Sequence, residues 1–318
     1  MFHWEQAAAL PPAAVDVTAV GEVLIDMISH RYDSDFVGDS FSSHFGGSPA
    51  NVAMNVRRLG WNAAIITSVG REPFGQFIVG ALKEAGVNTQ GVVRQAQHPT
   101  SMVVVSKSRH SPRFIAYRQA DRYLEPTEAA LALAASSRIL HFTSWPISLE
   151  PARSTVQELL AVARQQGRLI GFDPNYRDVL WEQGHDGRAF ITELLPLVDV
   201  VKPSDDDAEH IFGPGSPEIQ LQRFLDCGVP LVMLTLGSEG CLVGCAGDVR
   251  HLPTLATEVV DTTGAGDAFW SGFYSGLLAG LTVEKALRRG SATAAYKLTK
   301  TGAVVDLSLA AIQPWEGD

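Results

Sequence analysis

The chain is poor in cysteine and contains no apolar run long enough to cross a membrane. Cys227, Cys241 and Cys245 have no metal-ligand partners at a suitable spacing, so we expect free thiols in a reducing cytosol. The longest uncharged apolar run, residues 268–281, is too short to span a bilayer and is typical of a buried helix. Residues 1–15 lack the basic segment of a signal peptide. We therefore predict a cytoplasmic protein without a membrane partner.

Positive charge is scarce as well. Lys and Arg total 25 against 35 Asp and Glu, and the net charge of −10 argues against nucleic acid as the main partner. An acidic chain can still bind a nucleotide, because backbone amides and a metal ion act locally. The sequence also lacks internal repeats and long linkers. With 318 residues, of which 46% are hydrophobic, we expect a single α/β domain over residues 1–318 with a large core.

Strand and helix patterns alternate along most of the chain. The first third is typical of strand, helix, strand and helix, over residues 15–28, 48–60, 63–69 and 74–85. Ser48 is the expected N-cap of the first of these helices. The alternation resumes at residue 139 and ends with a helix over 282–298 and a short one from residue 308. This pattern predicts a mainly parallel sheet covered by helices.

Two segments, 29–45 and 91–120, interrupt this alternation. Residues 101–106 and 113–118 are β-type runs joined by a polar turn at 109–112, which indicates a hairpin. A hairpin does not fit easily into a parallel sheet. We therefore predict a small β lid, built from 29–45 and 91–120, over one edge of the core. A plain antiparallel extension of the sheet is the alternative.

Residues 261–269 read DTTGAGDAF, between a β-type run at 249–260 and an apolar helix that reaches about Gly280. The free amides and the dipole of a helix start attract anions, and glycine lets a phosphate approach closely. Asp267 would repel such an anion unless it removes a proton from an attacking hydroxyl. The alternative is that Asp267 only complements the helix dipole. Glycines four residues apart, at 272, 276 and 280, indicate close packing against a sheet.

Other polar residues stand out where the predicted strands end. In open α/β sheets, ligands bind at the carboxyl ends of the strands. Convergence of such residues on one cleft favours the active-site interpretation of Asp267. The residues in question are Asp26, Asp173, Asn175, Arg177, Ser204, Asp207, Gly237 and the loop 264–267.

Five motifs give the chain a specific resemblance over nearly its whole length. They are GEVLID at 21–26, GGSPANVAMNVRRLG at 46–60, FDPNYR at 172–177, TLGSEG at 235–240 and DTTGAGDAFWSGF at 261–273. In this order they resemble the ribokinase-like, pfkB-type carbohydrate kinases. The resemblance implies a three-layer α/β/α core with a β lid, ATP as the phosphoryl donor and a sugar hydroxyl as the acceptor.

The resemblance also implies residue roles. Asp267 would take the proton from the sugar, and the amides of Gly264, Ala265 and Gly266 would stabilise the transferring phosphoryl group. Residues that would contact the sugar are Asp26, Gly46, Gly47, Asn51, Arg118, Asp173, Asn175 and Arg177. Residues that would contact the nucleotide are Lys202, Ser204, Thr235, Gly237 and Gly240, together with Gly264 and Gly266.

Two metal sites follow from the same resemblance. Where the family usually has Asn-x-x-Glu, this chain has Ser204 and Asp207, and Asp207 would hold Mg²⁺ through water. The departure predicts an altered metal affinity. A monovalent cation such as K⁺ would bind backbone carbonyls at Asp261 and Thr263 and in the loop near Thr301.

The acceptor is open among several sugars. The segments 150–155, 172–177 and 180–181 most resemble bacterial fructokinases, so fructose is favoured, with 2-keto-3-deoxygluconate, ribose and nucleosides as alternatives. A dinucleotide-dependent oxidoreductase would need a third glycine where Asp267 stands. A non-catalytic sugar sensor would lack the base. Lids of this kind often pair between two chains, which favours a homodimer.

Overall fold

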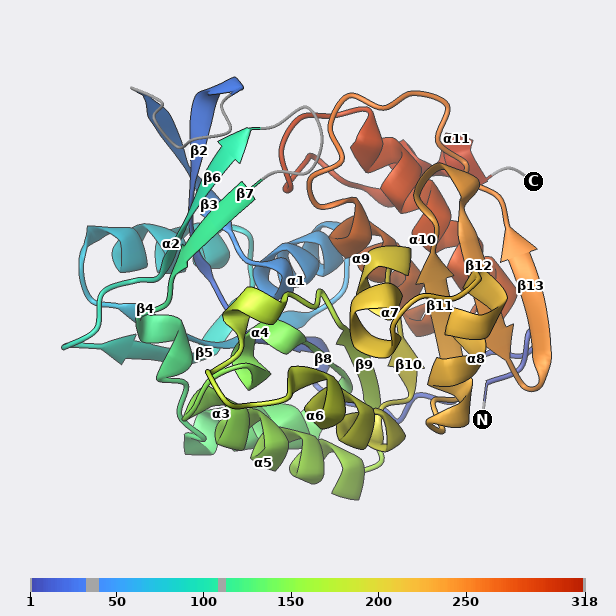
Figure 1. Cartoon of the computed structure of the whole chain (residues 1–318), viewed down its shortest axis with the longest axis horizontal. Helices are drawn as coiled ribbons and strands as arrows, with labels where there is room; N and C mark the ends of the chain where they lie inside the picture. Colours follow the sequence, from blue (N-terminus) through green and yellow to red (C-terminus); the bar gives the residue numbers. More distant parts are fainter. Residues whose placement is uncertain (1, 33–39, 108–112, 317–318) are drawn as a thin grey trace.

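The computed structural model describes residues 2–32, 40–107 and 113–316 of the chain. Within these ranges, one large sheet has nine strands in the order β13-β12-β11-β10-β9-β8-β1-β4-β5. The seven strands from β11 to β5 in this order are parallel to one another. Strands β12 and β13 continue the sheet at one edge in antiparallel pairing (Figure 1). The strands are β1 Val15–Val20, β4 Ala63–Gly70, β5 Asn88–Gln95, β8 Ser137–Thr143, β9 Leu169–Asp173, β10 Val200–Val201, β11 Leu231–Thr235, β12 Cys241–Cys245 and β13 Asp248–Leu252.

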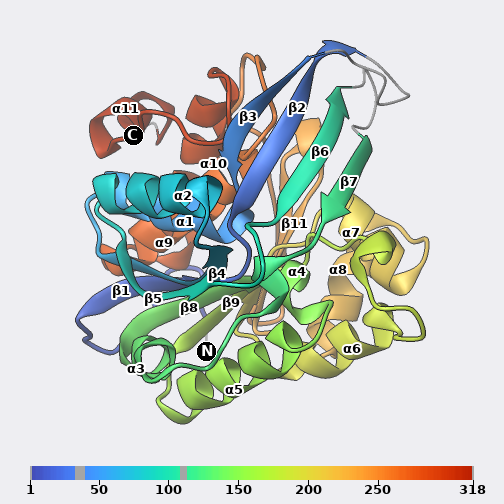
Figure 2. The same ribbon diagram turned by 90° about the vertical axis from the view of Figure 1, so that its left-hand side faces the viewer.

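Helices cover both faces of this sheet, because its strands present apolar side chains on both sides. Val17 and Ile65 pack on one face, while Val20 and Ile66 pack on the other. The first face is covered by α1 Ser48–Arg58, α2 Pro73–Glu84, α9 Ala265–Leu278 and α10 Val283–Leu298. The second face is covered by α3 Glu128–Ser136, α5 Ala152–Gln165, α6 Gly187–Leu194, α7 Asp205–Phe212 and α8 Pro217–Asp226. The predicted three-layer α/β/α arrangement is confirmed (Figure 2).

A second sheet stands at one edge of the core (Figure 2). In the described part of the chain it has four strands in the order β3-β2-β6-β7. These are β2 Leu24–Tyr32, β3 Phe41–Gly46, β6 Met102–Lys107 and β7 Arg113–Tyr117. The segments 33–39 and 109–112, which the sequence assigned to the lid and its turn, lie outside the described residues. The predicted lid is therefore a separate sheet, and the alternative of an antiparallel extension of the large sheet is wrong.

The predicted strand over 15–28 is wrong, because it is two strands in two different sheets. Gly21 lies between β1 and β2 and changes the direction of the backbone. Its φ of +146° is a value that residues with a Cβ rarely adopt. Asp26 therefore belongs to the lid and not to the parallel sheet. The lid boundary at residue 91 is also wrong, since residues 91–95 pair with β4 in the large sheet. The lid accordingly starts at Leu24.

Three further elements differ from the sequence predictions. Ser48 is the first residue of α1 and not its N-cap, which is Gly47. The β-type run at 249–260 ends as a strand at Leu252, so an irregular segment, not a strand, leads into Gly264. Helices α3 and α7 were missed, and α7 starts inside the acidic run at 205–207 because Ser204 and Asp207 form a capping box there. No helix within residues 2–32, 40–107 and 113–316 is long and apolar enough to cross a membrane.

Helices α9 and α10 approach each other very closely through glycines of α9. A Cβ added at Gly276 would lie 2.6 Å from the Cα of Ala286, and one at Gly272 would lie 2.7 Å from the carbonyl oxygen of Arg289. The glycine spacing thus indicates packing against a helix, where the sequence analysis expected a sheet. This contact holds α10 beside the helix that carries Asp267.

We predict that Gly276→Ala lowers the free energy of unfolding by about 1–3 kcal/mol, because the backbone of α10 must move to make room for the methyl group. Urea unfolding monitored by circular dichroism measures this change. Gly80→Ala is the matched control, since nothing lies within 4 Å of a Cβ at that position in α2. It should be neutral or stabilising by up to about 1 kcal/mol. Equal effects of the two substitutions would contradict the close contact.

Candidate active site

Asp267 lies in the first turn of α9, where two side chains of α1 hold its carboxylate. Ser48 Oγ donates a hydrogen bond to Oδ1 at 2.6 Å, and Asn51 Nδ2 donates one to Oδ2 at 2.8 Å. The residue is only 7% exposed. Burial raises the pKa of Asp267 to about 6, and the hydrogen bonds from Ser48 and Asn51 oppose that shift. The carboxylate is thus oriented, mostly ionised at neutral pH and still basic enough to accept a proton.

The start of α9 also provides the predicted bed of amides. Gly264 caps the helix in the left-handed conformation, with φ +76°, so that the chain turns sharply into Ala265 and Gly266. The negative charge of Asp267 next to these amides is partly offset by Lys202. A Cβ added at Gly266 would lie 3.3 Å from the Lys202 ammonium. A positive charge therefore lies directly beside the free amides of the helix.

Lys202 is itself fixed by Asp173. The two side chains are buried and form an ion pair with 3.0 Å between Nζ and Oδ2. Trp270 of α9 donates its indole N–H to the same Asp173 oxygen at 2.8 Å. Asp173 is therefore part of the support under the helix start, and it does not line the sugar-side cavity as the sequence analysis expected. Lys202 was predicted to contact the nucleotide, but it does not line the larger groove described below.

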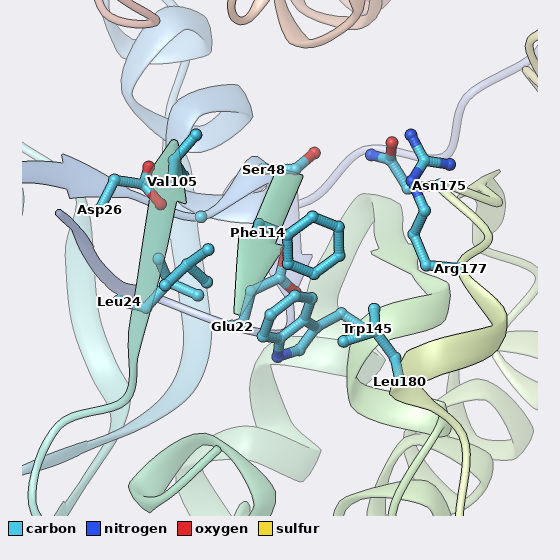
Figure 3. A pocket seen from close by; sticks show the side chains of 12 residues that line it. Glu22, Leu24, Asp26, Ser48, Val105, Phe114, Trp145, Asn175, Arg177 and Leu180 are labelled. Carbon is cyan, nitrogen blue, oxygen red and sulfur yellow. The ribbon is translucent and has the colours of Figure 1, made fainter. Parts of the chain in front are cut away.

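A cavity of about 260 Å³ opens between the lid and the core at the start of α1 (Figure 3). Ser48 lines this cavity and also donates to Asp267, so the cavity reaches a residue in direct contact with that carboxylate. Burial raises the pKa of Asp26 to about 6 and that of Glu22 to about 8. The lining residues are Glu22, Leu24, Asp26, Gly47, Ser48, Val103, Val105, Phe114, Trp145, Asn175, Arg177 and Leu180.

A larger groove of about 520 Å³ runs along the other side of the α9 start. Its walls include five residues predicted for the nucleotide, among them Gly266 of the amide bed, together with Ala265. Sequence reasoning missed the segment 253–256, Val259 and one face of α10, which make most of the apolar wall. The lining residues are Ser204, Asp205, Thr235, Gly237, Ser238, Gly240, Cys241, Pro253, Thr254, Leu255, Ala256, Val259, Thr262, Ala265, Gly266, Phe269, Ser291, Ala294, Ala295 and Leu298.

Three residues predicted to contact the sugar have other contacts in the structure. Asn51 is directed to Asp267, and Gly46 lies against the Asp26 side chain, where a Cβ would collide with it. Arg118 does not line the cavity. Its guanidinium pairs with Asp121 and donates to Ser148 Oγ and to the carbonyl oxygen of Trp145. Arg118 thus anchors the lid strand β7 to the core.

Sequence reasoning missed several residues of the cavity. Ser48 was interpreted only as a helix cap, although its position beside the two glycines of the motif at 46–60 was a usable signal. Glu22 lies inside the motif at 21–26, next to the Gly21 break. Leu180 lies in the segment 180–181 that resembles fructokinases, but it was given no place in the site. Phe114 and Trp145, which complete the apolar wall, gave no signal, because they come from distant parts of the chain.

The residues near the groove suit a magnesium ion held mainly by phosphates. Both Asp207 oxygens accept hydrogen bonds, from the amides of Tyr176 and Ser204 and from the Ser204 hydroxyl. Asp205 lines the groove. No group of three or more His, Cys, Asp or Glu suitable for a metal occurs in residues 2–32, 40–107 and 113–316. Mg²⁺ in kinase sites commonly relies on one or two carboxylates, water and substrate phosphates, so Asp205 fits that role. Asp207 is buried and does not line the groove, so it is not placed to hold the ion as the resemblance implied.

Comparison with known families decides what this arrangement belongs to. Residues 15–309 match the family described as "pfkB family carbohydrate kinase". The chain belongs to this family. The predicted family and fold are confirmed, and this pfkB chain is an ATP-dependent sugar kinase. The match excludes the dinucleotide-dependent oxidoreductase that the glycine loop left open.

Similar proteins act on fructose or on its phosphate. A curated ATP-dependent 6-phosphofructokinase from Thermoanaerobacterium thermosaccharolyticum is 48% identical over 307 residues, covering 96% of this chain and 95% of the relative. The solved fructokinase of Halothermothrix orenii is 40% identical, with a TM-score of 0.80 over 87% of this chain and 98% of that one.

A solved fructokinase of Vibrio cholerae shows which ligands a more distant relative holds. The structure contains fructose, ADP and calcium, and it is 29% identical to this chain, with a TM-score of 0.84 over 95% of this chain and 99% of that one. A double mutant of the same fructokinase contains fructose, ADP and potassium, at 29% identity and a TM-score of 0.84. These two structures cover 95% and 96% of this chain, so the likeness extends over both the core and the lid.

We predict that Glu22→Gln flattens the pH dependence of stability. The pKa of about 8 in the folded chain lies above the ordinary 4.5, so unfolding releases a proton between these values and stability falls as pH rises through this window. Glutamine cannot ionise, so between pH 5 and pH 8 the free energy of unfolding should fall less in the variant than in the unmodified chain. The difference should exceed about 1 kcal/mol, since one pKa unit corresponds to ~1.4 kcal/mol.

Urea unfolding at several pH values measures the difference. Glu158→Gln is the control, because Glu158 is exposed on α5 and should leave the pH dependence unchanged. A Glu22→Gln variant with the same pH dependence as the unmodified chain would show that Glu22 ionises like an exposed carboxyl.

Proposed function

We propose that the chain phosphorylates fructose, transferring the γ-phosphoryl group of ATP to a hydroxymethyl oxygen of the sugar. The observation that carries the proposal is the position of Ser48, which lines the cavity and contacts the Asp267 carboxylate. A sugar hydroxyl in the cavity can therefore reach the base. The groove that would hold ATP begins at Ala265 and Gly266, on the other side of the same carboxylate.

In this reaction Asp267 accepts the proton of the hydroxymethyl group as its oxygen attacks the γ-phosphorus. The bond between the γ-phosphorus and the β–γ bridging oxygen breaks, and ADP leaves. The amides of Ala265 and Gly266 stabilise the negative charge that moves during transfer, and Lys202 adds a positive charge nearby. A bound magnesium ion would neutralise phosphate charge on ATP, and Asp205 on the groove wall is the carboxylate that could hold it.

Polar groups around the cavity suit a neutral sugar. Asp26 presents a carboxylate that can accept hydrogen bonds from two hydroxyls. Glu22 has a pKa of about 8, so it is protonated at neutral pH and can donate a hydrogen bond. Asn175 contributes an amide from the β9 end, in a left-handed conformation with φ +40°. Trp145 and Phe114 offer apolar surface to the carbon face of the ring.

Fructose 6-phosphate is the second candidate acceptor. The relative with 48% identity is a 6-phosphofructokinase, and Arg177 at the cavity wall has a side chain that is 44% exposed. A guanidinium with this exposure can bind a phosphate through two parallel hydrogen bonds. Against this acceptor, the cavity wall also carries Asp26, whose ionised carboxylate would repel a phosphate beside it.

We predict that Asp267→Asn keeps the fold and nucleotide binding but lowers turnover by about 10²-fold or more, because the base is lost. A coupled assay of ADP release measures turnover with fructose, fructose 6-phosphate, 2-keto-3-deoxygluconate, ribose and nucleosides. We expect the highest kcat/KM with fructose. A higher kcat/KM with fructose 6-phosphate would assign the second acceptor, and near-normal turnover in Asp267→Asn would refute the role of the base.

The pH profile offers a separate test of how Asp267 is held. Turnover should fall as pH drops through about 6, since the base must be ionised. Ser48→Ala removes a hydrogen bond that favours the ionised form, so this acid limb should move to higher pH by about one unit. Ser271→Ala is the matched control, because its hydroxyl donates to the backbone carbonyl of Asp267 and not to the carboxylate. An unshifted limb in Ser48→Ala would mean that the limb reports another group.

A further inference from the structure

A completely buried lysine lies behind the loop that carries the amide bed. Lys297 is in the last turn of α10, is 0% exposed and ranks among the largest fully buried side chains of the described chain. Lysine is almost never fully buried unless its ammonium is paired. Its position therefore calls for specific partners.

Those partners belong to Asp261, at the start of the loop. Lys297 Nζ donates to the backbone carbonyl oxygen of Asp261 at 2.6 Å and lies 4.0 Å from its Oδ2. The Asp261 carboxylate also accepts the amides of Thr263 at 2.9 Å and Gly302 at 2.7 Å. Burial alone would raise the pKa of Asp261, but these amides and the charge of Lys297 lower it. The loop 261–264 and the loop after α10 are thus tied together around one ammonium group.

The same ammonium is bonded to the start of the segment that leads to Asp267. The backbone amide of Asp261 also reaches the end of α10, at the carbonyl oxygen of Leu298 (3.3 Å). A positive charge at Lys297 therefore acts on the segment that positions Ala265, Gly266 and Asp267.

This geometry does not fit the monovalent cation that the family resemblance implies. The Asp261 carbonyl oxygen is one of its expected ligands, and that oxygen already accepts a hydrogen bond from Lys297. A potassium ion on the same oxygen would lie within a few ångströms of the ammonium, where two positive charges repel strongly in a buried setting. The Vibrio cholerae fructokinase structure that contains potassium is only 29% identical to this chain.

We propose that the Lys297 ammonium takes the place of the K⁺ ion that the family resemblance predicts, so that this kinase works without a monovalent cation. Lys297 is a positioning residue, since it acts through the Asp261 loop and touches neither hollow. The effect on turnover rests on the phosphoryl transfer proposed above, whereas the effect on cation binding does not.

The test compares potassium chloride with choline chloride at equal ionic strength, because choline is too large for a site of backbone carbonyls. Thermal unfolding midpoints and ADP release are measured for the full chain. In the unmodified enzyme both quantities should be the same in the two salts. In Lys297→Met, which keeps the apolar stem, turnover in choline chloride should fall about tenfold or more. Potassium should then raise both turnover and the unfolding midpoint, as a ligand that binds the folded state does.

Lys300→Met is the matched control, since Lys300 is exposed three residues further on and should change neither quantity. Lys297→Arg keeps the charge and should remain insensitive to potassium. A potassium-specific rise of the midpoint in the unmodified enzyme would overturn the proposal, as would a Lys297→Met variant that behaves like the unmodified enzyme in both salts. If no sugar elicits ADP release, the proposed function fails, and the midpoints still decide the role of Lys297.

Discussion

The site depends on keeping a carboxylate in its basic form inside a buried, anion-binding helix start. Asp267 can stay there because Ser48 and Asn51 donate to its two oxygens and Lys202 places a positive charge nearby. Ser48 and Asn51 belong to α1 and Lys202 directly follows β10, so the arrangement exists only in the folded chain. The close contact between α9 and α10 at Gly276 holds the helix in place. The rest of the core mainly fixes these elements relative to one another.

The two hollows beside Asp267 have different origins. The groove is lined only by residues 204–298, all of which belong to the core. The cavity is lined partly by the lid strands β2, β6 and β7 and partly by the ends of core strands. Gly21 separates the two sheets within one short stretch of chain, so the lid strand β2 begins beside the cavity, where Leu24 lines it. Under the proposed function, the acceptor and the donor would approach the α9 start from two structurally distinct sides.

Sequence patterns predicted most of the core, because strand and helix periodicity and the glycine loop are local signals. They predicted the residues at strand ends for the same reason. They missed what depends on distance in the chain: Ser48 contacts a residue 219 positions away, and Arg118 turned out to brace the lid rather than to face the sugar. The break at Gly21 also escaped notice, since the residues on both sides of it, 15–20 and 23–28, are mostly apolar. Lys297 could not be recognised either, because helical periodicity does not reveal that an ammonium reaches a carbonyl on another loop.

The cavity is shared between two sheets, and the groove is not. Asp26 and Phe114 belong to the lid, whereas Ser48 and Asn175 belong to the core. Under the proposed function, a monosaccharide in the cavity would touch both groups and so add contacts between the lid and the core. A nucleotide in the groove would contact residues of the core and add none. Acceptor binding, more than donor binding, would then favour an ordered lid.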